Sequence, residues 1–149
     1  MTNPALQPRD PHDFSWVVDN FVASTPGVTH ALIVSADGLP LIAAGGMSPD
    51  LADPLAAMTS GIISLGNNIA SKVGEAGCDQ VMLKFPSGHF LFMSIGNLAG
   101  FAVLVREGAN LGVVAHQMAQ LVDAVGHVLT PQLRDDLRRM NAMSGGGGR

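Results

Sequence analysis

A cysteine and a histidine are candidates for covalent chemistry in this chain. Cys78 is the one cysteine, and His89 follows it at the start of an apolar run. A thiolate beside an imidazole base can act as a nucleophile in acyl transfer. A lone cysteine that begins an apolar strand, however, usually packs as a small apolar side chain. We therefore interpret Cys78 as a structural residue.

Three further residues could hold a metal ion. His116, Asp123 and His127 are separated by seven and four positions and would share the outer face of a helix. These steps lack the tight pairing of ligands that zinc motifs show. We expect a solvated polar face here and no metal site.

Phosphate chemistry has two candidate positions. The segment Gly45-Gly46-Met47-Ser48 joins an expected strand to a helix, but it lacks the lysine of a phosphate-binding loop and the spaced glycines of a dinucleotide fold. Arg106, at the end of a strand, could act on the phosphate of a partner as an arginine finger, but a strand-end arginine paired with Glu107 or solvated is the simpler interpretation. We expect no catalytic residue, no cofactor and no bound metal, so the chain is predicted not to be an enzyme.

The composition indicates one globular domain whose surface is partly covered by a partner. Of the 149 residues, 47% are hydrophobic, which is enough for a substantial core. Between Asn20 and Ser71 the only charged residues are Asp37, Asp50 and Asp53. So few charges solvate the surface of a small monomer poorly, which indicates that part of it is buried against another protein.

Charge and segment length exclude two other classes of partner. The net charge is −4, and the chain has no basic stripe of the kind that nucleic-acid binding requires. The most apolar segment, Phe90 to Val105, would reach about 24 Å as a helix, which is short of the hydrocarbon core of a bilayer. A lone cysteine and an N-terminus without signal-peptide features predict a cytoplasmic protein.

The first half of the chain reads as a helix, a hairpin and a second helix. Asp10-Pro11 predicts the start of a helix that ends near Ser24, before Pro26-Gly27. The segment from Pro26 to Gly46 predicts a hairpin folded about Asp37-Gly38. Its first strand has two apolar faces, which predicts that both are covered. One face carries Val28, Leu32 and Val34, and the other carries Ala31 and Ile33.

The second helix, from Pro49 to about Gly74, has two apolar faces. Large side chains at helical spacing predict the face that packs on the core: Leu51, Leu55, Met58, Ile62, Leu65, Ile69 and Val73. Mostly small side chains form the flank beside it: Ala52, Ala56, Thr59, Ile63, Gly66 and Ala70. Because small residues let a second helix approach closely, this flank is a candidate dimer interface.

The second half reads as three strands followed by helices. Short turns at Pro86-Ser87-Gly88 and Gly96-Asn97 predict an antiparallel meander, and Asn110 predicts the start of a third helix. The expected fold class is α+β, with a five-stranded antiparallel sheet between helix layers and the order helix-strand-strand-helix-strand-strand-strand-helix. The expected divisions are an N-terminal tail at 1–10, the domain at 11–129, a helical extension at 130–143 and a flexible Gly-rich tail at 144–149.

Several of these segments together resemble the roadblock/dynein light chain family, which shares the roadblock/profilin-like fold. They are the hairpin of Pro26 to Leu41, the small-residue second helix, the strands of Val81 to Phe92, and Ala109 to Val114. The resemblance implies that the first and third helices cover one face of the sheet and the second helix covers the other. It also implies a homodimer formed through the second helix and the third strand, which adds Gln80, Met82 and Lys84 to the expected interface.

The same resemblance implies a function. Bacterial members of this family typically regulate small Ras-like GTPases, some as activators and others as adaptors. A short acidic chain with a Gly-rich tail is similar to members from actinobacterial operons that also encode a GTPase and a sensor-kinase-like membrane protein. The alternatives are an assembly scaffold for the sensor-kinase complex that does not affect GTP hydrolysis, and a small-molecule sensor with a ligand between the sheet and a helix.

Overall fold

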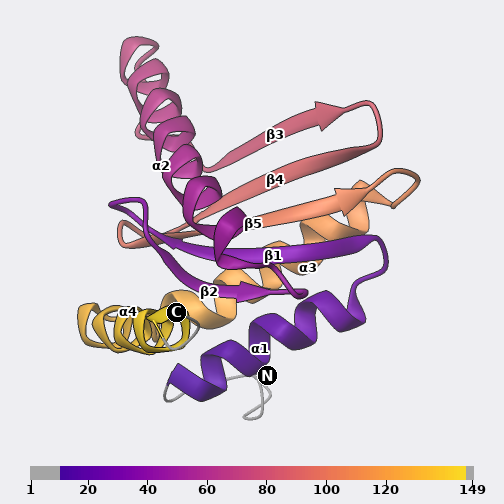
Figure 1. Ribbon diagram of the computed structural model, residues 1–149. Helices are drawn as coiled ribbons and strands as arrows, with labels where there is room; N and C mark the ends of the chain where they lie inside the picture. The colour runs from indigo at the N-terminus through magenta and orange to yellow at the C-terminus, as the bar shows by residue number, and fades with distance from the viewer. Residues whose placement is uncertain (1–10, 147–149) are drawn as a thin grey trace.

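The structure is a computed structural model that describes residues 11–146, so the predicted tail at 1–10 and the last three residues, 147–149, lie outside the described residues. Nine elements follow one another along the chain (Figure 1): α1 (Pro11–Ser24), β1 (Val28–Ser35), β2 (Pro40–Ala44), α2 (Pro49–Lys72), β3 (Gln80–Phe85), β4 (Gly88–Ile95), β5 (Ala99–Arg106), α3 (Leu111–Gly126) and α4 (Pro131–Gly146). The predicted order and fold class are confirmed.

The five strands form one antiparallel sheet in the order β2-β1-β5-β4-β3. α1, α3 and α4 lie on one face and α2 crosses the other (Figure 1). The predicted hairpin about Asp37-Gly38 joins β1 to β2, where the Ser35 N–H donates to the Leu39 carbonyl at 2.9 Å. The apolar segment from Phe90 to Val105 comprises most of β4, a turn and most of β5.

The larger of the two cores lies between the sheet and α1, α3 and α4. Phe14, Phe101 and Met118 are fully buried in it. The rings of Phe21 and Phe101 meet edge to face with centroids 5.0 Å apart, a favoured aromatic geometry. α3 begins where predicted, because the Asn110 side chain accepts a hydrogen bond from the Val113 N–H at 3.2 Å.

β1 is covered on both faces, as its sequence predicts. Leu32 and Val34 pack in the smaller core under α2, whereas Ala31 and Ile33 pack in the larger core. The predicted face of Val28 is wrong, since Val28 also lies in the larger core. The cause is an irregularity in the pairing with β5 between Val28 and His30, because an extra residue in a strand reverses the side-chain alternation.

The predicted orientation of α2 is also wrong. Four small residues from the predicted dimer flank are buried: Ala52, Ala56, Thr59 and Ala70. Five large residues from the predicted core stripe are exposed: Leu51, Met58, Leu65, Ile69 and Val73. Leu32, Val34, Phe90 and Phe92 already fill the space above the sheet, so that mainly small side chains fit between it and the helix.

α4 is part of the domain core rather than a separate extension. Leu133 and Leu137 are buried in the larger core, where α4 packs against β2 and α1. Its backbone stays helical through Gly146, three residues past the predicted boundary at 143, so residues 144–146 belong to the helix and not to a tail.

Candidate functional site

The structure separates the two residues that could have formed a nucleophile and its base. The Cys78 carbonyl accepts a hydrogen bond from the Ser94 hydroxyl at 3.1 Å, which places Cys78 beside the end of β4. His89 lies five positions away along β4, a distance of about 17 Å. Cys78 and His89 therefore do not form a catalytic pair.

The other candidate residues for chemistry lie apart on the surface. His116 contacts Gln120 at 3.2 Å, and His116, Asp123 and His127 are exposed along and just beyond α3. Among residues 11–146, no group of three metal-binding side chains converges. Arg106 is exposed at the end of β5, and within the same residues it has no ion pair.

The glycines between β2 and α2 have a structural explanation. Gly45 adopts φ +83°, and a Cβ there would lie 2.2 Å from the Thr29 carbonyl oxygen. The residue is thus required by a tight turn against β1.

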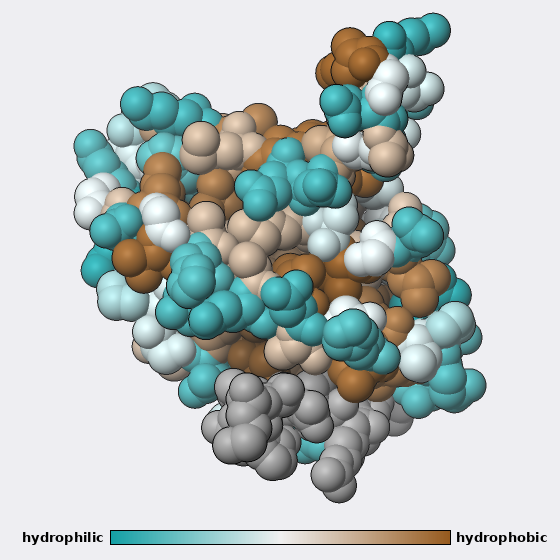
Figure 2. Space-filling model, turned by 180° about the vertical axis from the view of Figure 1, so that it is seen from behind, coloured by the Kyte–Doolittle hydropathy of each residue, from teal (hydrophilic) through white to brown (hydrophobic). Residues whose placement is uncertain are grey.

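A continuous apolar surface runs along one side of α2. We call Leu51, Met58, Leu65, Ile69 and Val73 the apolar flank; each is 40–68% exposed. At 100° per residue these five side chains fall within about 80° of arc. The C-terminal end of α2, which carries the last of them, projects beyond the sheet (Figure 1) and stands out from the body of the molecule when seen from behind (Figure 2).

The apolar surface continues on β3. Leu83 is paired with Phe90, and Phe85 with Gly88, so both side chains lie on the α2 face of the sheet. Both are exposed, because α2 does not extend over this end of β3 (Figure 1). A single copy of the chain therefore leaves the α2 side of its sheet incompletely covered.

β3 is also the open edge of the sheet within residues 11–146. It pairs with β4 on one side only. The opposite edge is protected, since β2 begins at Pro40, has irregular pairing beside it and has α4 packed against it. Unpaired backbone groups along β3 can accept another strand.

The predicted interface residues fall into two groups. Ala52 and Ala56 pack on the chain's own sheet, Thr59 and Ala70 are also buried, Ile63 is half-buried, and a Cβ at Gly66 would meet Cys78 Sγ at 2.9 Å. Gln80, Met82 and Lys84 are exposed on β3, on the face opposite to α2. Sequence reasoning missed the apolar flank because both faces of α2 lack charge, and size alone assigned the large side chains to the core. Self-association itself stays a prediction.

The other side of α2 borders a groove of about 720 Å³. Its floor includes Val34, Ile63 and Phe92, and hydroxyl and amide side chains line its rim. The ring of Phe92 lies over Gly100, where a Cβ would come within 2.0 Å of it. Among residues 11–146, no lysine or arginine lines the groove, and Asp79 is its one carboxylate. The lining therefore suits a neutral or cationic ligand better than an anion.

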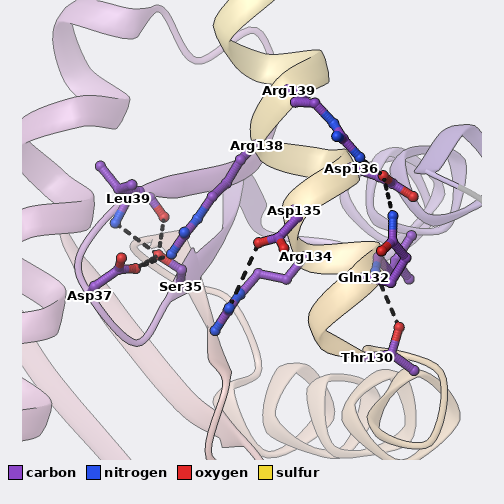
Figure 3. A network of polar contacts seen from close by, with 11 residues as sticks. Ser35, Asp37, Leu39, Thr130, Gln132, Arg134, Asp135, Asp136, Arg138 and Arg139 are labelled. Carbon is purple, nitrogen blue, oxygen red and sulfur yellow. Dashed lines mark hydrogen bonds and ion pairs between the residues drawn. The ribbon is translucent and has the colours of Figure 1, made fainter.

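A polar network ties α4 to the β1–β2 turn (Figure 3). Arg138 forms an ion pair with Asp37, which also accepts a hydrogen bond from the Ser35 hydroxyl. The Ser35 hydroxyl and, to a smaller extent, the charge of Arg138 lower the pKa of the Asp37 carboxyl below its ordinary value. On the far side of the same turn, the Ser60 hydroxyl donates to the Ala36 carbonyl at 3.2 Å. The turn thus connects α2 with α4.

Comparison with known proteins identifies the family. The model of the Roadblock/LC7 domain matches residues 14–105, which is more than half of the chain. The chain belongs to the Roadblock/LC7 family. No curated protein sequence matches it significantly.

Solved structures agree with this assignment. A Roadblock/LC7 domain from Streptomyces avermitilis is 32% identical, with a TM-score of 0.72 over 78% of this chain and 98% of that one. The gliding protein MglB from Thermus thermophilus is 20% identical, with a TM-score of 0.71 over 85% of this chain and 96% of that one. Profilin from Schizosaccharomyces pombe shares the fold at 16% identity, with a TM-score of 0.61 over 78% of this chain and 99% of that one. In residues 11–146, no helix combines the length and apolarity that a bilayer crossing requires.

Proposed function

We propose that this protein is a homodimer that regulates a small Ras-like GTPase through surface contacts, without contributing a catalytic residue. One observation carries the proposal: a single chain leaves the apolar flank, the end of β3 and the β3 edge uncovered together. Membership of the Roadblock/LC7 family, whose bacterial members are typically GTPase regulators, supports the identity of the partner.

A second copy is the occupant that suits this surface best. The apolar flank and the open edge lie on the same side of the fold, so one two-fold axis beside β3 can cover both. The flank carries no charged residue that would oppose self-association. A homodimer also explains why so little of the chain between Asn20 and Ser71 is charged.

The proposal is tested with a purified small Ras-like GTPase from the same organism. The purified chain is mixed with that GTPase, and GTP hydrolysis is measured with and without it, together with binding. A faster rate supports an activator. Binding without a change in rate supports the alternative of an assembly scaffold that also holds a sensor-kinase-like membrane protein. Neither binding nor a rate change would contradict both forms of the proposal.

The groove beside α2 favours a second candidate function, that of a small-molecule sensor. Its volume of about 720 Å³ lies within the range typical of ligand sites, and its apolar floor has a polar rim. A ligand that binds the folded state raises the unfolding temperature. A thermal-shift screen of neutral and cationic metabolites tests this, with Ser64→Phe, at an exposed position that lines the groove, as the variant that fills it. An unchanged melting temperature throughout the screen would argue against the sensor.

A further inference from the structure

The backbone N–H and C=O groups of β3 point alternately toward β4 and toward the open edge, and the direction of each residue can be assigned. The Ser94 N–H donates to the Asp79 carbonyl at 3.0 Å, so this pair of opposed residues is hydrogen-bonded. Hydrogen-bonded and non-hydrogen-bonded pairs alternate along an antiparallel ladder. Val81, Leu83 and Phe85 therefore turn their backbone N–H and C=O groups toward β4. The intervening three residues, Gln80, Met82 and Lys84, turn theirs toward the open edge.

Two other observations agree with this assignment. Phe85 and Gly88 are opposed across a two-residue turn, where the closing pair of a hairpin is hydrogen-bonded. The Gln80 carbonyl accepts a hydrogen bond from the Cys78 thiol at 3.4 Å, so this carbonyl points away from β4.

Two-fold symmetry then restricts how β3 can pair with β3 of a second copy. Directly opposed residues in an antiparallel pair point to the same face of the sheet. Along β3 the even-numbered side chains point to one face and the odd-numbered side chains to the other, so an even residue must oppose an even one and an odd residue an odd one. The two-fold axis therefore passes through a residue position and not between two residues.

We propose that the axis passes through Met82, so that Met82 lies opposite Met82 of the second copy and Gln80 lies opposite Lys84. This inference rests on the proposed homodimer. It uses every outward-facing residue of β3, in three opposed pairs with two hydrogen bonds each, or about six in all. An axis at Val81 or at Leu83 would retain only two such pairs within the strand, or about four hydrogen bonds.

The side chains favour the same register. An axis at Lys84 would oppose two lysines, which destabilises a strand pair, whereas the proposed register opposes each lysine with a glutamine amide. On the α2 face, Val81 lies opposite Leu83 of the second copy, which gives an apolar pair. Both apolar flanks then lie on one face of a joined sheet.

Disulfide trapping tests the register. In a Cys78→Ala background, Met82→Cys places two thiols on opposed residues whose Cα atoms are about 5.5 Å apart, within reach of a disulfide. Val81→Cys or Leu83→Cys leaves the Cα atoms about 8.5 Å apart, which is too far. Met82 is exposed in the single chain, so the substitution should not disturb folding.

The oxidant is diamide, which accepts the two hydrogen atoms released when the disulfide forms. We expect Met82→Cys to give covalent dimer at least roughly tenfold faster than either neighbouring variant. The double variant Gln80→Cys/Lys84→Cys should also cross-link, whereas each of its single substitutions should not.

Sedimentation of the same variants separates the possible failures. A monomer at all concentrations would overturn the homodimer and with it the register. A dimer that cross-links fastest at another single position would overturn the register alone. The GTPase assay is independent of both, so that a dimer with the proposed register and no effect on any GTPase would contradict only the proposed regulatory function.

Discussion

The exposed face of α2 leads to a quantitative prediction for Leu65→Lys. Leu65 is 65% exposed on the apolar flank, and it is far from the small residues that pack on the sheet. We expect the substitution to weaken self-association strongly while the folded monomer remains intact.

The magnitude follows from the area that the side chain would bury in a dimer. Burying a whole leucine side chain contributes about 1.5–3 kcal/mol, so the exposed two-thirds contributes about 1–2 kcal/mol. Each substitution occurs twice in a symmetric dimer, which gives about 2–4 kcal/mol. At 1.4 kcal/mol for each factor of ten, the dissociation constant should rise roughly 30- to 700-fold. The desolvation of lysine can only increase this effect.

Sedimentation over a concentration series measures the dissociation constant, and urea unfolding checks the fold. The matched control is Ser71→Lys. Ser71 is exposed on the same helix but lies about 160° around it from Ile69 of the apolar flank, so it is outside the flank. The control should leave the dissociation constant nearly unchanged. If Leu65→Lys and Ser71→Lys change the dissociation constant alike, the apolar flank is not the interface. If Leu65→Lys unfolds the chain, the expectation of an intact folded monomer is wrong.

Three further substitutions test other parts of the structure. Leu137→Ala, at a residue 1% exposed, should lower the free energy of unfolding by about 2–5 kcal/mol in urea titration, and a change near zero would show that α4 is dispensable to the core. Gly100→Ala should destabilise the fold by about 1–3 kcal/mol because its Cβ would collide with the Phe92 ring, and Phe92→Leu should restore part of the loss in the same assay. Because the Ser35 hydroxyl lowers the pKa of Asp37 in the folded state, Asp37→Asn should cost stability at neutral pH, and that cost should vanish as pH falls through the lowered pKa, below about 4. A cost of Asp37→Asn that is independent of pH would contradict this assignment.

Element boundaries were predictable wherever a turn has a strong local signal. Asp37-Gly38 and Pro86-Ser87 lie between apolar runs, and Asn110 precedes an amphipathic stretch, so local chemistry defines where each element starts and ends. The coverage of β1 on both faces also followed from its lack of polar alternation.

The predictions that failed depended on tertiary packing. Residue size alone does not indicate which of two uncharged faces of α2 packs on the sheet, because the space left by Phe90 and Phe92 decides it. The face of Val28 depends on an extra residue in the ladder, which no alternation pattern reveals. Likewise, the segment 130–143 was expected to be an extension outside the domain, and only the packing shows that Leu137 is buried deeply in the core.

The unequal edges of the sheet set an upper limit on assembly by strand addition. Each copy offers β3, while Pro40, the irregular pairing of β2 and the packing of α4 obstruct the other edge. If two copies join through β3, both outer edges of the resulting sheet are obstructed, so growth stops at two copies and a fibre cannot propagate. α4 thus helps to prevent strand addition at the β2 edge. Its removal would expose β2 and should make the protein prone to ordered aggregation at concentrations where the full chain stays a closed pair.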